Sequence, residues 1–551
     1  MRNKTWLILL LLITISFSIH AQQKNKPLEN STSISRPKLV VGLVIDQMRW
    51  DYLYRYYNRY GKGGFRRLMQ QGYNFQNTFI PFVPTVTAPS HTSIYSGSVP
   101  AITGIVGNDW IENNTGKLMY CSKDDSVKSV GTTSSEGRMS PKNMLVTTIA
   151  DELRMATNFR SRTFGIAMKD RGGIFPAGHN ANAAYWFEDA SGNWITSTYY
   201  MNNLPNWVKD FNARRYPDKY MSNNWNLLYP AESYIQSTVD DKLFEKTLPL
   251  ETTRTFPHSY KNAIGKNYYS FRVNPFGNNF TLDFASALIK NEKLGKTPET
   301  DMLCISLSST DYIAHRFGPN SMEVEDCYLR LDKEIEKFLN MLDAQVGKGN
   351  YLLFLTADHG SSNVPGFMQE NKLPGGNLNA KLMIPEMNKM LKQQFKADSI
   401  VKKIYNYQVY FDYPLLDSLK LNKEAIKISV LNFLLAKPEV MHAFDYLQFD
   451  KLVLPAKIKE MYAKGYFRTR NGDIQFMLKP QYQDVDWSGA EHATWYPYDT
   501  HIPLIFFGWN ISSGKTYREV YMTDIAPTVS AMLSIQMPSG SIGSVLTEVV
   551  K

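Results

Sequence analysis

The chain has 551 residues, of which 43% are hydrophobic, so it can bury a large core. Its length alone would allow roughly two to four domains. The formal net charge is +10, but Lys and Arg are scattered rather than gathered into runs, which argues against nucleic-acid binding. A mild field that favours anionic small molecules is the expected consequence.

The N-terminus has the pattern of an export signal. Arg2 and Lys4 precede a run of mostly apolar residues, and the small residue Ala21 offers a cleavage site. We therefore expect residues 1–21 to be a signal peptide and the protein to be periplasmic or secreted. Ile19 stands where a small residue is usual, so an uncleaved N-terminal anchor is the alternative.

The polar residues 22–36 are expected to form a flexible leader, and the globular domain is expected to cover residues 37–551. No later stretch is apolar for long enough to span a bilayer, so we expect a soluble mature protein. The three cysteines do not build a disulfide framework. Cys304 and Cys327 are expected to be buried on a strand and a helix, whereas Cys121 lies in a predicted loop.

The pattern of apolar residues predicts an α/β fold. From Pro37 to about residue 190, apolar runs alternate with helical stretches, as in a doubly wound, mostly parallel central sheet with helices on both faces. Residues 191–280 are rich in Asn, Tyr, Trp and Pro and predict an inserted cap segment, and the Lys-rich residues 371–485 predict a second one. A strand at 501–509 and a helix at 523–533 would finish the fold.

One long helix is clear from its periodicity. In residues 320–347 the apolar positions step by three and four, which predicts a helix that packs one stripe on the sheet. Asn320 or Ser321 would cap its start and Gly347 would end it.

Three Val/Leu/Ile-rich runs each end in an acidic residue. Such runs predict buried parallel strands, and the ligand site of an open α/β sheet lies beyond the carboxyl ends of its strands. One crevice is therefore expected to collect three carboxylates and two imidazoles, which suits one or two zinc ions. The residues are Asp46 after the first run, Asp311 and His315 after the second, and Asp358 and His359 after the third.

The segment VPTVTAPSHTSIYSG, residues 83–97, supplies hydroxyl groups that a metal would activate. Its two prolines bracket a tight turn, and a helix that begins there would offer free N–H groups to an anion. A hydroxyl at that helix start beside a metal ionises readily and can act as a nucleophile. The candidates are Thr85, Thr87, Ser90 and Thr92.

Six motifs follow one another along the chain: VIDQMRWDYLYRY, PTVTAPSHTSIYSG, STDYIAH, TADHG, EHATWYPYDTHIPLIFFG and TDIAPTVSAMLSIQMPSGSIG. Together they resemble the alkaline phosphatase superfamily over nearly the whole chain from Pro37. The resemblance is strongest to the PafA-type secreted bacterial zinc alkaline phosphatases with a threonine nucleophile, which are related to nucleotide pyrophosphatase/phosphodiesterases. It implies an alkaline phosphatase-like catalytic domain that hydrolyses phosphate monoesters and releases inorganic phosphate.

The resemblance also assigns roles to residues. In that family the second Thr of the P-T-x-T pattern is the nucleophile, which implies a phosphothreonine intermediate at Thr87. Two Zn²⁺ ions are implied as cofactors. One would be held by Asp46, Thr87, Asp358 and His359, and the other by Asp311, His315 and His492.

Two other histidines lie near the predicted site residues in the sequence. His501 lies in the same segment as His492 but directly precedes a core strand, so we expect it at the strand edge. His91 is expected to brace the nucleophile turn rather than bind metal.

A monoester dianion presents an extra charged oxygen that needs a donor. The resemblance places Asn108, Lys169 and Arg171 there, and a guanidinium can grip two phosphate oxygens while Lys adds a point charge. The implied partners are small-molecule phosphate monoesters, with no nucleic-acid binding, no membrane span after signal cleavage, and a monomeric state.

Four alternatives use the same residues differently. A phosphodiesterase or nucleotide pyrophosphatase of the same fold would share the metal ligands but replace Lys169 and Arg171 by an apolar pocket. A sulfatase needs a C/S-x-P-x-R pattern, where this chain has T-A-P-S-H. Phosphoglycerate-mutase-like or phosphonate-cleaving activity stays open, because one metal platform supports several reactions. An exported binding protein without turnover would lose a ligand, and no inferred ligand is lost.

Overall fold

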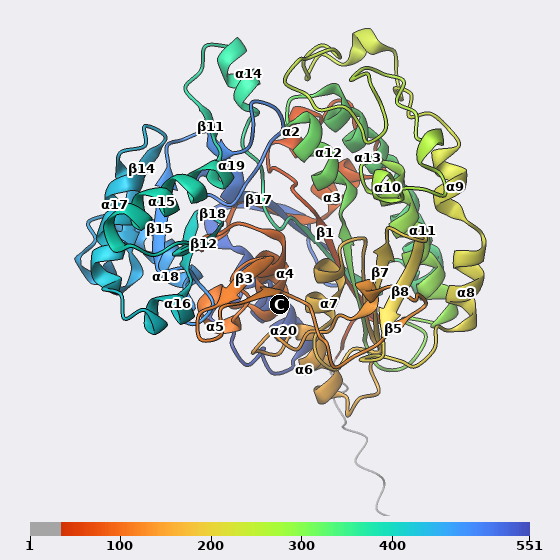
Figure 1. Ribbon diagram of the computed structural model, residues 1–551. Helices are drawn as coiled ribbons and strands as arrows, with labels where there is room; N and C mark the ends of the chain where they lie inside the picture. Colours follow the sequence, from red (N-terminus) through yellow and green to blue (C-terminus); the bar gives the residue numbers. More distant parts are fainter. Residues whose placement is uncertain (1–34, 551) are drawn as a thin grey trace, which may run out of the picture. The chain divides into compact units, whose positions relative to one another are not determined.

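The structure is a computed structural model that describes residues 35–550 (Figure 1). The predicted signal peptide and residues 22–34 of the predicted leader lie outside the described residues. The chain divides into the units Met1–Arg36 and Pro37–Lys551, and every element named below belongs to the second unit. Within residues 35–550, no helix is both long enough and apolar enough to cross a membrane.

A ten-stranded sheet forms the centre of this unit, in the order β18-β2-β17-β10-β1-β9-β6-β7-β8-β5. Its five middle strands are parallel, and all their residues are buried, which explains why their sequences are apolar runs without alternation. The predicted doubly wound, mostly parallel fold is confirmed. The five strands are β10 (Tyr351–Thr356), β1 (Leu39–Ile45), β9 (Asp301–Leu307), β6 (Thr163–Ala167) and β7 (Ala183–Glu188).

The strands that flank the parallel centre have mixed directions. β17 (His501–Gly508) runs antiparallel to both β10 and β2 (Tyr73–Phe79), and β18 (Gly514–Tyr521) closes that edge parallel to β2. At the opposite edge, β8 (Asn193–Ser197) is antiparallel to β7 and to β5 (Ser129–Val130). The sheet is therefore parallel where the strands carry the acidic residues and mixed outside that region.

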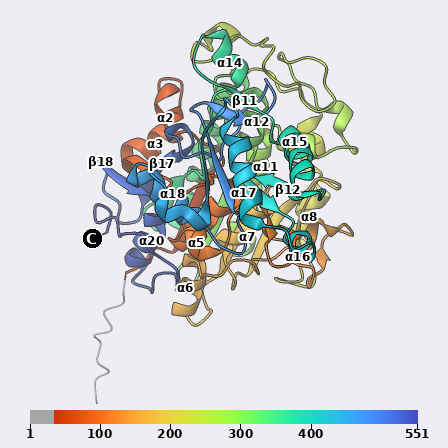
Figure 2. The same cartoon turned by 60° about the vertical axis from the view of Figure 1, so that its left-hand side comes forward.

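Helices pack in two layers around the sheet (Figures 1 and 2). In one layer α4 (Thr87–Ser96), α7 (Asp170–Ala177) and α20 (Ile525–Leu533) pack together, with α7 against β6, β7 and β9. In the other layer α11 (Phe276–Asn291) packs against β6, β9 and α13 (Met322–Leu342). The layer with α4 and α7 supplies the candidate nucleophile and basic residues.

Helix α13 is the long helix that the sequence predicts. Ser321 is its N-cap, and the Ser321 side chain accepts a hydrogen bond from the backbone N–H of Val324. The helix passes into a π-helical turn, η4 (Asp343–Gly347), and ends at Gly347, whose φ of 107° suits glycine. The predicted apolar stripe is buried: Tyr328, Leu331, Ile335, Phe338 and Leu342.

Residues 371–485 carry a smaller sheet of their own, which lies in the cyan and blue region of Figure 1. Its order is β12-β13-β15-β14, and two helices, α15 and α17, pack against it. Its apolar side chains form a core distinct from that of the central sheet. The bounds are β12 (Val401–Tyr405), β13 (Gln408–Phe411), β14 (Val440–Asp445), β15 (Ile474–Leu478), α15 (Ala380–Phe395) and α17 (Lys423–Leu435).

The remaining elements are short connections. At the start of the predicted insertion 191–280, β8 is a strand of the central sheet, and at its end α11 packs on that sheet. The boundaries of both insertions stay a prediction. Cys121, Cys304 and Cys327 are buried and free. The short elements are α2 (Tyr52–Arg55), α3 (Phe65–Gln71), α5 (Pro100–Thr103), β3 (Asp109–Glu112), β4 (Lys117–Tyr120), α6 (Ile149–Ala156), α8 (Asn206–Ala213), α9 (Tyr216–Met221), α10 (Tyr269–Arg272), α12 (Ser309–Phe317), α14 (Pro365–Glu370), β11 (Gly376–Leu378), α16 (Tyr413–Ser418), α18 (Ala456–Gly465), β16 (Tyr482–Asp484) and α19 (Pro497–Thr500).

Candidate active site

The carboxyl ends of three adjacent strands bring the predicted acidic residues together. Asp46 directly follows β1, Asp311 lies in the first turn of α12 after β9, and Asp358 follows β10. Their side chains belong to two groups in which the potential ligand atoms lie within 4.8 Å of one another. The groups are Asp46, Asp358 and His359, and Asp311, His315 and His492.

The first group is fully buried. The Nε2 atom of His359 lies 3.4 Å from Asp358 Oδ2 and 3.7 Å from Asp46 Oδ1, while its Nδ1 atom lies 3.1 Å from the Gly360 carbonyl. That carbonyl fixes the proton on Nδ1 and leaves the Nε2 lone pair directed at the carboxylates. Burial, with Asp311 and Asp358 nearby, raises the pKa of Asp46, and burial lowers the pKa of His359 to about 3.

Several atoms of this group have no hydrogen-bond partner although they are buried: both carboxylate oxygens of Asp46, Asp358 Oδ2 and His359 Nε2. Asp46 Oδ2 lies 2.7 Å from the Lys169 ammonium, but this ion pair lacks the angles of a hydrogen bond. Unpartnered buried acceptors are costly unless something else binds them. Converging acceptors that outnumber the nearby donors fit a bound cation.

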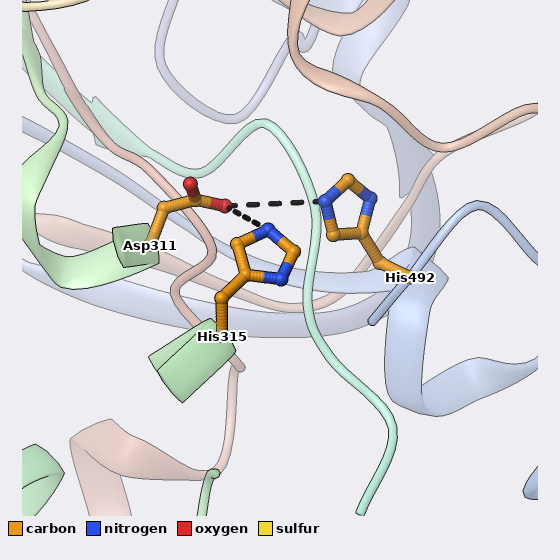
Figure 3. A group of neighbouring side chains, drawn as sticks. All are labelled: Asp311, His315 and His492. Atoms are coloured by element: carbon orange, nitrogen blue, oxygen red, sulfur yellow. Dashed lines mark ion pairs between the residues drawn. The ribbon is translucent and has the colours of Figure 1, made fainter. Parts of the chain in front are cut away.

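The second group is drawn in Figure 3. Asp311 Oδ1 lies 3.2 Å from His315 Nε2 and 3.9 Å from His492 Nε2. The other ring nitrogens are held by backbone carbonyls, since Nδ1 of His315 lies 2.6 Å from Ala490 O and Nδ1 of His492 lies 2.6 Å from Thr85 O. Both rings therefore present Nε2 to Asp311, as metal-binding histidines do.

The two imidazoles of this group differ in the direction of their pKa shifts. Burial opposes the charged form of His315, but Asp311 and Glu491 outweigh it and raise its pKa to about 10. Burial, together with the neighbouring His359 and His315, lowers the pKa of His492. A cation in the group would hold both rings in the neutral form, because metal binding displaces protons from its ligands.

Thr87 is the first residue of α4, and the preceding residue, Val86, offers no side-chain cap. Pro89 has no N–H and the Ala88 N–H is taken by Asn108, so among the first three residues of the helix only the Thr87 N–H is available beside the Thr87 hydroxyl. The side-chain oxygen of Asn108 accepts a hydrogen bond from the Ala88 N–H at 3.0 Å, which leaves the Asn108 amide donors for other partners. Thr87 and Asn108 line one pocket of about 440 Å³ together with Asp311, His315 and His492.

Lys169 and Arg171 line the same pocket. Lys169 follows the end of β6, and its ammonium lies 2.6 Å from Asp311 Oδ2, 2.7 Å from Asp46 Oδ2 and 3.3 Å from Thr87 Oγ1. Burial opposes the charge of Lys169, but the two carboxylates raise its pKa. The guanidinium of Arg171 donates to the Tyr120 hydroxyl at 3.0 Å.

His91 and His501, which the sequence does not predict as ligands, have other partners, although Nδ1 of His91 also lies 3.4 Å from Asp358 Oδ2. Nδ1 of His91 is 2.9 Å from the Thr87 carbonyl and Nε2 is 2.9 Å from the Ser306 hydroxyl, so this ring braces the start of α4. His501 begins β17 and contacts the Gln76 carbonyl. Neither belongs to the two groups of potential ligands.

Three residues of the site escape the sequence patterns. Gln47 donates from its side chain to Asp311 at 2.9 Å and from its backbone to Asp358 at 3.0 Å, so it joins the two groups. The sequence shows that Gln47 directly follows a strand-end acid, but it does not show the left-handed backbone of Gln47, whose φ is 61°. Tyr120 is the last residue of strand β4 and Lys246 lies in an irregular segment, and neither position carries a sequence signature that points to the site.

Comparisons with known proteins agree with this geometry. A family model described as type I phosphodiesterase / nucleotide pyrophosphatase matches residues 40–483. The chain is 51% identical to alkaline phosphatase PhoV of Synechococcus elongatus over 97% of both chains, and 47% identical to alkaline phosphatase PafA of Elizabethkingia meningoseptica over 99% of both. A Myroides odoratus protein named calcium-transporting ATPase is 46% identical over 100% of both chains.

A crystal structure of wild-type alkaline phosphatase PafA shares the fold, with a TM-score of 0.92 and 47% sequence identity. It is matched over 94% of this chain and 100% of that chain. The family model covers more than half of the sequence, and the relatives cover nearly all of it. The chain therefore belongs to the type I phosphodiesterase / nucleotide pyrophosphatase family and, within it, to the PafA-type alkaline phosphatases.

Proposed function

We propose that this phosphate-monoester hydrolase, an alkaline phosphatase, uses Thr87 as its nucleophile and forms a phosphothreonine intermediate. One observation carries the proposal: the Thr87 hydroxyl lies at the start of α4, in a pocket that also holds Lys169 and a group of potential metal ligands. A hydroxyl beside a positive charge and potential metal ligands is the arrangement that nucleophilic attack on a phosphoryl group requires.

Metal dependence follows from the family, and we propose two zinc ions as the cofactors. Asp46, Asp358 and His359 would hold one ion, with Thr87 beside it, and Asp311, His315 and His492 would hold the other. Carboxylate oxygens and imidazole nitrogens are ligands that suit zinc, and unpartnered acceptors are present in the first group. Bound zinc supplies charge that lowers the pKa of a nearby hydroxyl and neutralises phosphate oxygens.

Residues of the chain carry out the phosphoryl transfer and hold the phosphoryl group. Thr87 Oγ1 forms a bond to phosphorus while the bond from phosphorus to the ester oxygen breaks, and the alcohol leaves. Water then attacks the phosphorus of phosphothreonine, which releases inorganic phosphate and restores Thr87. Asn108, Lys169 and Arg171 donate to the non-bridging oxygens and hold the phosphoryl group in line with Thr87.

A phosphodiesterase is the second candidate, because the family model bears that name. The cations of Lys169 and Arg171 favour the monoester, since a diester would place a neutral ester group where these residues offer positive charge. The ATPase name of one relative is compatible with the same chemistry, because ATP ends in a phosphoryl group that is also a dianion.

The proposal is tested by the ratio of kcat/KM for an aryl phosphate monoester to that for the matching diester, with Thr87→Ala as the blank. A ratio strongly in favour of the monoester, lost in the blank, is expected. A ratio in favour of the diester would make the enzyme a phosphodiesterase, and activity that survives in the blank would overturn Thr87 as the nucleophile.

We also propose that the protein is exported, with residues 1–21 removed, and that its partners are small-molecule phosphate monoesters. N-terminal sequencing of the protein from a periplasmic fraction tests the export and the cleavage after residue 21. An intact Met1 in the membrane fraction would show an anchor instead.

A further inference from the structure

Two basic residues line the active-site pocket without a role in the proposed mechanism. Lys246 lies in the predicted insertion 191–280, and Arg316 follows the potential ligand His315 on α12. The backbone N–H of Lys246 donates to the Arg316 carbonyl at 3.1 Å, so the two residues lie side by side. Both are partly exposed, as a contact with a substrate requires.

The position of the Lys246 ammonium is marked by Gly489. A Cβ atom on Gly489 would lie 2.7 Å from Lys246 Nζ and 2.8 Å from the carbonyl oxygen of His315. Gly489 has a φ of 85°, and the absence of a side chain there makes room for the Lys246 stem. The ammonium therefore lies next to the backbone of His315, on the side of the pocket that holds the group Asp311, His315 and His492.

Arg316 is held in place against the same segment. Its guanidinium donates to the backbone carbonyl of Thr247, the residue after Lys246. A guanidinium fixed by one carbonyl keeps other N–H groups for a second acceptor. Arg316 therefore forms a fixed part of the pocket wall, and the Lys246 ammonium lies beside it.

The nearby acids have other partners. Asp311 is paired with Lys169, and Glu491 lies 3.4 Å from Nδ1 of His315. Within residues 35–550, the Lys246 ammonium makes neither an ion pair nor a hydrogen bond. Glu491 lines the same pocket and is attracted by the Lys246 charge without forming an ion pair with it, so the Lys246 ammonium stays available to an anionic ligand group.

We propose that Lys246 and Arg316 form a subsite for a second anionic group, carried by the alcohol part of the substrate. The inference rests on the proposed function, in which Lys169 and Arg171 hold the scissile phosphoryl group in line with Thr87, and it places the leaving alcohol on the His315 side of the pocket. The substrates favoured by this subsite are phosphate monoesters whose leaving group bears a carboxylate or a second phosphate.

The test compares three phenyl phosphates that differ only at the para position: a neutral carboxamide, a carboxylate and a phosphonate. In Lys246→Met we expect kcat/KM to fall about three- to tenfold for the two anionic substrates, as for a partly exposed ion pair, and to stay unchanged for the carboxamide. Lys246→Arg should restore the preference, and added salt should weaken it in the wild type but not in Lys246→Met. A larger loss for the phosphonate would identify a second phosphate as the natural group, and a larger loss for the carboxylate would identify a carboxylate.

Lys266→Met is the matched control, because Lys266 is an exposed lysine of the same segment that does not line the pocket. An equal loss on all three substrates in Lys246→Met would overturn the subsite and make Lys246 a general attractor of phosphate esters. No change on any of them would overturn it as well. Both results leave the phosphatase intact, whereas a wild-type enzyme that hydrolyses none of the three would overturn the proposed function itself.

Discussion

The ammonium group of Lys169 lies 3.3 Å from the Thr87 hydroxyl and simultaneously contacts Asp46 and Asp311. One residue thus lies between the candidate nucleophile and both groups of potential metal ligands. Lys169 lies two residues after the end of β6, and the sheet fixes this position because β6 pairs with β9, the strand that precedes Asp311. The central sheet therefore positions the positive charge that would contact the phosphoryl group.

The contribution of Lys169 and Arg171 is expected to be specific for monoesters. Replacing both by Ala should lower kcat/KM for the monoester by at least about a hundredfold, since a lost donor to a developing phosphoryl charge has effects of that size. The diester carries one negative charge less and should lose much less. The ratio of the two kcat/KM values checks this, and an equal loss on both substrates would contradict the assignment.

The number of zinc ions bound by single-residue variants should show whether each group of ligands holds one ion. We expect two zinc ions per wild-type chain, and about one in either His359→Ala or His492→Ala, because each variant removes one ligand of one group. His501→Ala is the control, since His501 lies at the start of β17 outside both groups, and should keep two ions. Metal analysis of the purified variants decides the count. A single zinc ion in the wild type would contradict the two-ion proposal.

Removal of the metal should also destabilise the fold. Asp46, Asp311 and Asp358 are buried close together, and a cation that binds only the native state offsets their repulsion. Ligand at a hundred times its dissociation constant contributes about 2.7 kcal/mol. We expect a chelator to lower the melting temperature and added zinc to restore it. An unchanged melting temperature would show that the native fold does not depend on the ions.

A buried histidine that belongs to neither metal group predicts a pH dependence of stability. His258 lies between two carboxylates, 3.0 Å from Glu251 and 3.2 Å from Glu323. Burial opposes its charge, but these carboxylates raise its pKa to about 9. Because the folded pKa exceeds the usual value of about 6.5, the contribution is complete below pH 6.5 and is lost as the pH rises through about 9.

The difference between the two pKa values corresponds to at most roughly 3–4 kcal/mol, at roughly 1.4 kcal/mol per pH unit. The free energy of unfolding, measured in urea from pH 6 to pH 10, should therefore fall more steeply in the wild type than in His258→Gln. Parallel curves for the two proteins would contradict the ion pairs of His258.

The segment that carries the nucleophile also depends on a distant glycine. Gly465, at the end of α18, lies so close to the backbone of Val83 that a Cβ atom would overlap the Val83 carbonyl. Gly465→Ala must displace residues 83–87, so we expect kcat to fall and stability to drop by about 1–3 kcal/mol. Ala463→Gly, two residues earlier in the same helix, controls for helix propensity. Full activity in Gly465→Ala would contradict the tight contact.

Part of this structure could be predicted from sequence and part could not. Asp46, Asp311 and Asp358 could be placed because parallel strands deliver their carboxyl ends to one edge of the sheet. The direction of β17 could not, since HIPLIFFG is a buried apolar run whether the strand is parallel or antiparallel. His492 was placed by resemblance alone, because it lies in a loop and depends on the Thr85 carbonyl for its orientation. Lys246 reaches the pocket through an irregular segment that no periodicity describes.

The most direct test of the central claim is to find the phosphoryl group on the protein. The zinc-loaded enzyme is mixed rapidly with an aryl phosphate, quenched in acid, and mapped by peptide mass spectrometry. We predict phosphate on Thr87 in the wild type and on the same position in Thr87→Ser, and none in Thr87→Ala. Phosphate on another residue, or turnover by Thr87→Ala at the wild-type rate, would contradict the claim that Thr87 is the nucleophile.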